Sequence, residues 1–230
     1  MIIGITGSFG SGKTMVSDIF KIYGFEVINV DRLYHSIYEK DSKLKNELME
    51  EFGTLEREEI RKIAFNDFKK LRRLNEIAHP IIISELKKEI SKIEKRNEKL
   101  MPMTKKYKKN DSIEKNTIIK NNIQKKSDNK TKQKTAIKIV IDVPLLFEAK
   151  MENIVDKIVV VKCDEKIQME RIMKKSNKYS KKEIKQIIQS QMPLKEKIKR
   201  ADFVVDNSKD VSKTKEQVRK ISRFIENNLI

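Results

Sequence analysis

The chain has 230 residues, with 52 Lys and Arg against 34 Asp and Glu, a formal net charge of +18, and a single cysteine, Cys163. One cysteine cannot form an internal disulfide, which excludes a disulfide-built secreted scaffold and favours a reducing, cytoplasmic compartment. No stretch approaches the roughly 18 apolar residues that cross a bilayer, so no membrane span is expected. A sequence pI near 9.7 would by itself suggest a nucleic-acid or other anionic partner.

Short β-branched runs alternate with helical patterns along the chain. The apolar runs predict strands at residues 2–5, 27–30, 137–143, 158–161 and 203–205. Runs without polar alternation indicate strands buried on both faces, as in a parallel sheet covered by helices. Helical spacing predicts helices over 13–23, 41–52, 67–78, 81–94, 165–175, 180–191 and 210–228. This order predicts an α/β layered domain with a helical excursion between the second and third strands.

Most of the excess charge lies in one segment. Residues 95–138 hold fifteen basic and four acidic side chains, a net charge of +11, among Asn, Ser and Thr with few apolar residues. Such a segment cannot bury enough apolar surface to offset the entropy of ordering it. We therefore interpret 95–136 as a disordered, low-complexity insertion, and expect nucleic acid to bind only non-specifically, through 95–138.

Four of the six glycines lie within the first twelve residues. Residues 7–14 fit the pattern G-x-x-x-x-G-K-[ST] and lie between a predicted buried strand and a helix. Glycines let backbone N–H groups approach phosphate oxygens, and the helix N-terminus favours an anion. Lys13 can reach the β- and γ-phosphates, and the Thr14 hydroxyl can ligate Mg²⁺. We therefore expect the chain to bind a nucleoside triphosphate through this loop.

Two carboxylates follow predicted strands at the same edge of the sheet. Asp31 ends the second strand and could accept the proton of an attacking hydroxyl, although it could equally be the N-cap of the next helix. Asp142 ends the third strand and has the placement of a carboxylate that holds Mg²⁺, directly or through water. Its alternative role is a polar strand end, with Pro144 as a strand stopper.

Taken together, these motifs resemble the dephospho-CoA kinase family of P-loop kinases. The segments that carry the resemblance are 3–14, 27–31, 53–57, 64–65, 77–82, 142–148, 191–194, 197 and 201–208. They cover nearly everything outside the insertion, and the run Asp-Val-Pro-Leu-Leu-Phe-Glu at 142–148 is nearly the family signature. The resemblance implies transfer of a phosphoryl group from ATP to the ribose 3′-hydroxyl of dephospho-CoA, which yields coenzyme A and ADP.

The resemblance also implies an architecture. It is an α/β fold of the P-loop NTPase class, with a nucleotide-kinase-like parallel five-stranded sheet, flanking helices, a helical substrate-binding excursion and a lid. The nucleotide-binding core would comprise 1–32, 137–173 and 196–230, the CoA-binding excursion 33–94, and the lid 174–195. Closing the lid would keep water from competing with the ribose hydroxyl. The chain is expected to be a monomer or a trimer.

Residue roles follow from the same resemblance. Lys13, Asp31 and Arg171 would be catalytic, and Thr14 and Asp142 would hold Mg²⁺. The implied ATP contacts are Gly7, Ser8, Phe9, Gly10, Ser11, Gly12, Lys13, Thr14, Met15 and Arg171. The implied contacts with dephospho-CoA are Asp31, Arg57, His79, Pro80, Pro144, Leu145 and Phe147. From the residues alone, Arg171 could instead be a surface arginine, and His79-Pro80 could be a simple helix-start turn.

Two lid positions depart from the family pattern. Lys174 and Lys175 stand where an arginine is usual, and Ile187 aligns with another lid arginine. Lysine keeps the charge but loses bidentate phosphate geometry, so Lys175 and Lys178 could share that task. Two other functions remain open. One is another P-loop nucleoside or nucleotide kinase, and the other is a P-loop protein that binds RNA or another polyanion through 95–138.

Overall fold

The computed structural model describes residues 1–100, 137–175 and 179–228. Within them, a five-stranded parallel sheet has the order β2-β3-β1-β4-β5. The strands are β1 (Ile2–Gly7), β2 (Glu26–Asn29), β3 (Ile139–Asp142), β4 (Lys157–Lys162) and β5 (Phe203–Asp206). The predicted parallel sheet is confirmed, and each predicted strand lies within two residues of an observed one.

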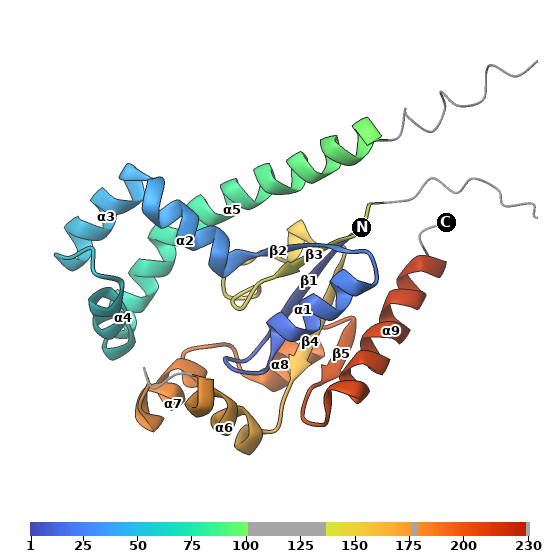
Figure 1. Cartoon of the computed structure of the whole chain (residues 1–230). Helices are drawn as coiled ribbons and strands as arrows, with labels where there is room; N and C mark the ends of the chain where they lie inside the picture. The colour runs from blue at the N-terminus through green and yellow to red at the C-terminus, as the bar shows by residue number, and fades with distance from the viewer. Residues whose placement is uncertain (101–136, 176–178, 229–230) are drawn as a thin grey trace, which may run out of the picture.

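Helices cover both faces of this sheet (Figure 1). Alternate strand residues such as Ile5 and Val161 pack against α1 (Lys13–Ile22) and α9 (Val211–Asn227). The residues between them, such as Ile141 and Val160, pack against α8 (Leu194–Lys199) and the second half of α5 (Phe68–Leu100). The β-branched runs are therefore buried on both faces, as the sequence pattern predicts.

The segment between β2 and β3 forms a helical layer at one end of the sheet (Figure 1). It consists of α2 (Val30–Lys40), α3 (Ser42–Phe52), α4 (Arg57–Asn66) and the first half of α5. These helices share their own apolar cluster, in which Leu44 and Leu48 are fully buried. Leu33 and Ile82 pack against both this cluster and a sheet cluster, so the excursion has a core of its own that continues into the core of the sheet.

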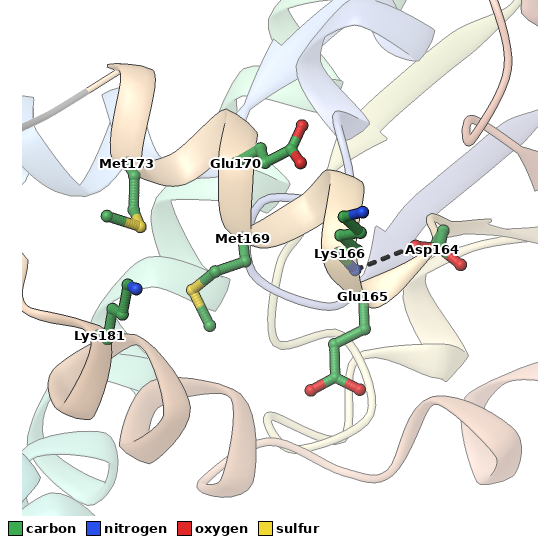
Figure 2. A pocket seen from close by; sticks show the side chains of 7 residues that line it. All are labelled: Asp164, Glu165, Lys166, Met169, Glu170, Met173 and Lys181. Carbon is green, nitrogen blue, oxygen red and sulfur yellow. Dashed lines mark hydrogen bonds between the residues drawn. The ribbon is translucent and has the colours of Figure 1, made fainter.

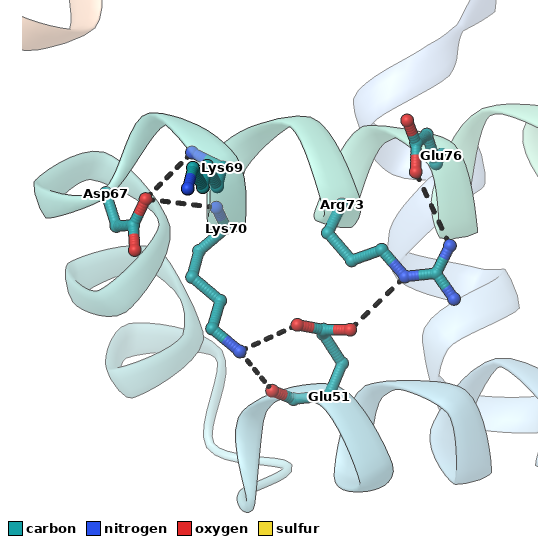
Figure 3. A network of polar contacts seen from close by, with 6 residues as sticks. All are labelled: Glu51, Asp67, Lys69, Lys70, Arg73 and Glu76. Carbon is teal, nitrogen blue, oxygen red and sulfur yellow. Dashed lines mark hydrogen bonds and ion pairs between the residues drawn. The ribbon is translucent and has the colours of Figure 1, made fainter.

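Polar contacts fix α3 against the start of α5 (Figure 3). Glu51 on α3 accepts hydrogen bonds from Lys70 at 2.7 Å and Arg73 at 3.2 Å on α5. These two cations lower the pKa of the Glu51 carboxyl. Such exposed pairs contribute little to stability, so the apolar cluster holds the two helices and the charges set their orientation.

One helix prediction is wrong. The patterns at 67–78 and 81–94 predict two helices separated by His79-Pro80, but α5 runs without a break from Phe68 to Leu100, with Pro80 inside it. Proline removes one backbone hydrogen bond and usually kinks a helix. Here Ile77 packs into the excursion cluster and Leu86 into the sheet cluster, so burial on both sides of Pro80 keeps the helix continuous.

The same helix corrects the start of the predicted insertion. Residues 95–100 belong to α5 rather than to a disordered segment, while 101–136 lie outside the described residues. The remaining elements are η2 (Glu152–Ile154), α6 (Glu165–Lys175) and α7 (Lys181–Gln189). A capping box of Ser180 and Glu183 starts α7. None of the described helices is both long and apolar enough to cross a membrane.

Candidate active site

A cavity of about 1080 Å³ lies where the carboxyl edge of the sheet faces the excursion and the α6–α7 segment. The glycine-rich loop between β1 and α1 forms its floor, with Lys13 and Thr14 in the lining. Asp31, Asp142 and Arg171 also line it, from three other segments. Parallel strands bring their carboxyl ends together, so residues far apart in the chain meet at this edge.

Steric constraints explain why the loop has glycine at two positions. Gly10 and Gly12 have φ values of 79° and 88°, which side chains with a Cβ rarely adopt. A Cβ on Gly12 would collide with the side-chain amide of Asn207, and one on Gly10 with Ile172. The loop is thus pressed against α6 and the segment after β5, and only glycine fits between them.

Lys13 is buried at the centre of the loop. Its Nζ donates to the carbonyl oxygens of Gly7 at 3.2 Å and Ser8 at 3.0 Å. Burial lowers the pKa of Lys13 to about 8, because the nearby Asp142 and Asp31 carboxylates offset only part of the lost hydration. With two neutral carbonyls as its hydrogen-bond acceptors, the ammonium group is poised to gain a stronger interaction with a polyphosphate.

Asp142 lies between β1 and β2, opposite Ile5 and Asn29 in the strand register. Its Oδ2 accepts hydrogen bonds from the Thr14 hydroxyl at 3.0 Å and the Asn29 amide at 3.1 Å. Its Oδ1 is buried and has no hydrogen-bond partner among the described residues. Burial raises the pKa of this carboxyl, which Lys13 partly counteracts.

The unsatisfied oxygen fits a cation. A buried carboxylate oxygen without a partner costs free energy that a divalent ion would recover. The described residues contain no cluster of three or more His, Cys, Asp or Glu that could enclose a metal ion. Mg²⁺ does not require one, because it commonly binds one or two protein oxygens together with water and substrate phosphates. Asp142 and Thr14 could therefore hold Mg²⁺ with a bound nucleotide.

Asp31 lies in the first turn of α2 and is open to the cavity. The alternative role as N-cap is wrong, because Asn29 is the N-cap and its side chain accepts from the Arg32 N–H at 2.9 Å. Partial burial raises the pKa of Asp31, while Lys13 and Arg57 act in the opposite direction. The Asp31 carboxylate therefore does not cap the helix, and it lies near the phosphate loop.

Arg171, on α6, is half-buried at the wall of the cavity. Its guanidinium donates to the main-chain oxygen of Asn207 at 2.8 Å and contacts the buried Cys163 thiol at 3.5 Å. It is therefore not a simple surface arginine. One terminal nitrogen makes both contacts, which leaves other N–H groups of the fork for a ligand.

The other predicted contact residues divide into two groups. Phe9, Met15, His79, Pro144 and Leu145 line the cavity, whereas Gly7, Ser8 and Ser11 lie in the loop outside the lining. Among the residues that the structure describes, Arg57, Pro80 and Phe147 also lie outside that lining. Arg57 stacks on the rings of Tyr34 and Tyr38, Pro80 is on the exposed side of α5, and Phe147 is buried in a sheet cluster.

Sequence reasoning missed three polar residues that hold the loop. Asn207 donates to the Ser11 carbonyl at 2.9 Å, and Gln168 donates to the Ser8 hydroxyl at 3.2 Å and to the Phe9 carbonyl. The Gln191 side chain accepts from the Phe9 N–H at 2.9 Å. Asn207 lies two residues after the predicted strand at 203–205, which is a signal for this edge of the sheet. The two glutamines lie on helical patterns that give no such signal.

A second hollow of about 580 Å³ lies along α6 and α7 (Figure 2). Met169 and Met173 form its apolar part, and charged side chains such as Glu165 and Lys181 surround them. It is shallow, and its lining includes none of the phosphate-loop residues. The 1080 Å³ cavity is therefore the candidate active site.

The parallel sheet, the glycine-rich loop and the carboxylate beside it define a P-loop protein of the nucleotide-kinase class. A family model described as dephospho-CoA kinase matches residues 1–104 and 103–213. The chain therefore belongs to the dephospho-CoA kinase family.

Full-length relatives agree with this membership. The chain is 35% identical to a dephospho-CoA kinase of Carboxydothermus hydrogenoformans over 94% of this chain and 90% of that protein. It is 31% identical to a dephospho-CoA kinase of Bacillus cereus over 96% of this chain and 95% of the relative. A crystal structure of a Thermus thermophilus protein has the same fold, with a TM-score of 0.70 at 24% identity, covering 98% of this chain and 97% of that one.

Proposed function

We propose that this protein transfers the γ-phosphoryl group of ATP to the ribose 3′-hydroxyl of dephospho-CoA, giving coenzyme A and ADP. The observation that carries the proposal is the shared cavity, in which Lys13, Asp142 and Asp31 from three different segments face one space of about 1080 Å³. That volume exceeds the upper range of most single-ligand pockets, as a site for two substrates requires. Family membership supports the choice of acceptor.

The phosphates of ATP bind at the loop. Backbone N–H groups of Gly10, Gly12 and Lys13 cradle them at the start of α1, and Lys13 transfers its hydrogen bonds from the loop carbonyls to phosphate oxygens. Arg171 contributes a second positive charge from α6. Both cations stabilise the charge that spreads over the transferring group.

Thr14 and Asp142 hold Mg²⁺ in this proposal, because the Thr14 hydroxyl and Asp142 Oδ1, which has no partner in the part of the chain that the structure describes, are hard oxygen donors beside the loop. When bound, Mg²⁺ neutralises charge on the β- and γ-phosphate oxygens.

Asp31 is the general base. As the ribose 3′-oxygen forms a bond with the γ-phosphorus and the bond from that phosphorus to the ADP oxygen breaks, the hydroxyl proton moves to the Asp31 carboxylate. His79, Pro144 and Leu145 form the acceptor side of the cavity. Burial lowers the pKa of His79, so this side chain is neutral at pH 7 and can donate or accept a hydrogen bond.

The proposed division of the chain into parts is the one that the family resemblance implies. Residues 1–32, 137–173 and 196–230 make the core, 33–94 the excursion that binds the CoA moiety, and 174–195 the lid. Lys174 lines the cavity and supplies charge where the family has an arginine. Lys178 lies outside the described residues, as does the side chain of Lys175.

The partners in this proposal are ATP and dephospho-CoA. A cytoplasmic location fits the one cysteine, Cys163, which is unpaired and buried.

A substrate panel tests the reaction. ADP release would be measured with ATP and dephospho-CoA, against adenosine, AMP, CMP and shikimate as other acceptors. With ATP present, turnover is expected with dephospho-CoA and with none of the other acceptors. Turnover only with one of those other acceptors would overturn the assignment.

Asp31→Asn tests the base. The variant is expected to bind ATP normally but to lose transfer by roughly 10²–10⁴-fold, the usual scale for general-base catalysis. Undiminished transfer would remove Asp31 from the mechanism.

A further inference from the structure

One residue of the phosphate loop is held by both ends of the α7 segment. The Phe9 ring packs edge-on against the Tyr179 ring, with centroids 5.5 Å apart and planes at 75°. The Phe9 N–H donates to the Gln191 side chain at 2.9 Å. Tyr179 precedes α7 and Gln191 follows it, so α7 is attached to the loop before its first turn and after its last.

Tyr179 also reaches the excursion. The guanidinium carbon of Arg61, on α4, lies 4.4 Å from the centroid of the Tyr179 ring. A contact at this distance is a cation–π interaction, and Arg61 is oriented by an ion pair with Glu58 at 2.6 Å. The helices α4 and α7 are in contact, and Figure 1 shows them as neighbours. One aromatic ring therefore contacts both the phosphate loop and helix α4 of the excursion.

The contact has no evident role in core packing. The three apolar clusters that the described residues form include neither Phe9 nor Tyr179. The Tyr179 side chain is half-buried and lines the active-site cavity together with Phe9. Loss of this ring would therefore remove contacts between the two substrate-binding parts while leaving the three apolar clusters intact.

We propose that Tyr179 is a positioning residue that couples the acceptor-binding excursion to the phosphate loop, so that the site closes around ATP only together with the excursion. This inference rests on the proposed function. Loss of the ring would loosen the seal between α4 and α7 and admit water. Water would then attack the γ-phosphorus in place of the ribose hydroxyl, and the bond to ADP would break with release of inorganic phosphate and a proton.

The test measures inorganic phosphate and coenzyme A in the same reaction of the full-length protein with ATP and dephospho-CoA. In Tyr179→Ala, the ratio of phosphate to coenzyme A is expected to rise about fivefold or more, the scale of losing one partly buried ring contact. The KM for dephospho-CoA should rise with it, with a smaller change in the KM for ATP.

Three matched variants separate positioning from folding. Tyr179→Phe keeps both ring contacts and should retain the wild-type ratio, and Arg61→Met should shift it in the same direction as Tyr179→Ala. Phe68→Ala removes an exposed ring of the excursion that does not line the cavity, and should leave the ratio unchanged. Thermal midpoints would be recorded for all four variants.

The outcomes distinguish the two proposals. If the wild type does not phosphorylate dephospho-CoA, the proposed function fails. If the wild type does so and Tyr179→Ala shows an unchanged ratio, or Phe68→Ala shows the same rise, the inference about Tyr179 is wrong while the function stands. A rise in Tyr179→Phe equal to that in Tyr179→Ala would also contradict it, because the ring would then not be the coupling group.

Discussion

The side-chain amide of Asn207 donates to the main-chain carbonyl of Ser11 across 2.9 Å and so ties the segment after β5 to the phosphate loop. Asn207 is buried, and its Oδ1 accepts from the Thr214 hydroxyl at 3.0 Å. Its main-chain oxygen accepts a hydrogen bond from the Arg171 guanidinium. One residue therefore sets the positions of both the loop and the arginine that faces it.

Asn207→Ala is expected to weaken the loop, because it removes the hydrogen-bond donor of the buried Ser11 carbonyl. The free energy of unfolding should fall by about 1–3 kcal/mol, the cost of an unsatisfied buried group. The KM for ATP should rise more than that for the acceptor. Urea unfolding and initial-rate kinetics measure the two effects.

Asn228→Ala is the control for that experiment. Asn228 is exposed at the end of α9, where its side chain donates to the Phe224 carbonyl at 2.7 Å. Its loss should change stability by less than about 0.5 kcal/mol. Equal losses in the two variants would show that the Asn207 contact has no special role.

Lys13 is expected to take up a proton when ATP binds at alkaline pH. In the nucleotide-free protein its pKa is about 8 instead of the ordinary 10.5, because burial disfavours the charged form. Bound phosphates favour that form and raise the pKa again. Between about pH 8 and 10, ATP affinity should therefore fall as pH rises, approaching tenfold per unit for one linked proton.

Calorimetry at pH 8.5–9 in buffers of different ionisation enthalpy measures this uptake. Lys21→Met, on the exposed side of α1, should bind ATP with the same proton uptake as the wild type. Binding without any uptake of protons by the wild type would contradict the shifted pKa of Lys13.

Asp142→Asn is expected to separate metal affinity from folding. The Mg²⁺ concentration for half-maximal turnover should rise about tenfold or more, because the amide removes the charge that favours the ion. The thermal midpoint without nucleotide should not fall, since the buried carboxylate has a raised pKa and an oxygen without a partner among the described residues. An unchanged Mg²⁺ requirement would place the metal elsewhere.

An ion pair between the fully buried Lys197 and the mostly buried Glu148 lies beside the acceptor side of the site. Lys197 contacts Glu148 at 2.9 Å and the Pro144 carbonyl at 3.3 Å, and the Met192 N–H donates to the same Glu148 oxygen. Lys197→Met should cost about 3–5 kcal/mol, because it leaves a buried carboxylate without its cation.

The double variant Lys197→Met with Glu148→Leu should be more stable than Lys197→Met alone, since neither charge is then left unpaired. Lys199→Met serves as control, because Lys199 is exposed and pairs only with Glu196 on the same helix at 2.7 Å among the described residues. Denaturant unfolding decides the order, and a double variant less stable than Lys197→Met would show that the pair is not coupled.

The parallel sheet, the phosphate loop and the two carboxylates beside it, Asp31 and Asp142, were predictable from the sequence alone. Short runs of β-branched apolar residues between helical segments predict buried strands of a parallel sheet. Residues 7–14 form a local motif, and its function depends on its own backbone N–H groups. Asp31 and Asp142 were predictable because strand ends in a parallel sheet lie at one edge. The choice between base and cap for Asp31 was not predictable, because Asn29, Asp31 and the helix start are too close in sequence to separate.

Tertiary structure alone decided the rest. Helical patterns on both sides of Pro80 predicted a break, and only burial against two different clusters explains why α5 continues. Arg57, Pro80 and Phe147 lie outside the cavity lining among the described residues, although nothing in their local pattern distinguishes them from His79 or Pro144. The contacts of Asn207, Gln191 and Tyr179 with the loop join residues more than 160 positions apart. Such pairings depend on how helices pack, which periodicity within one segment does not encode.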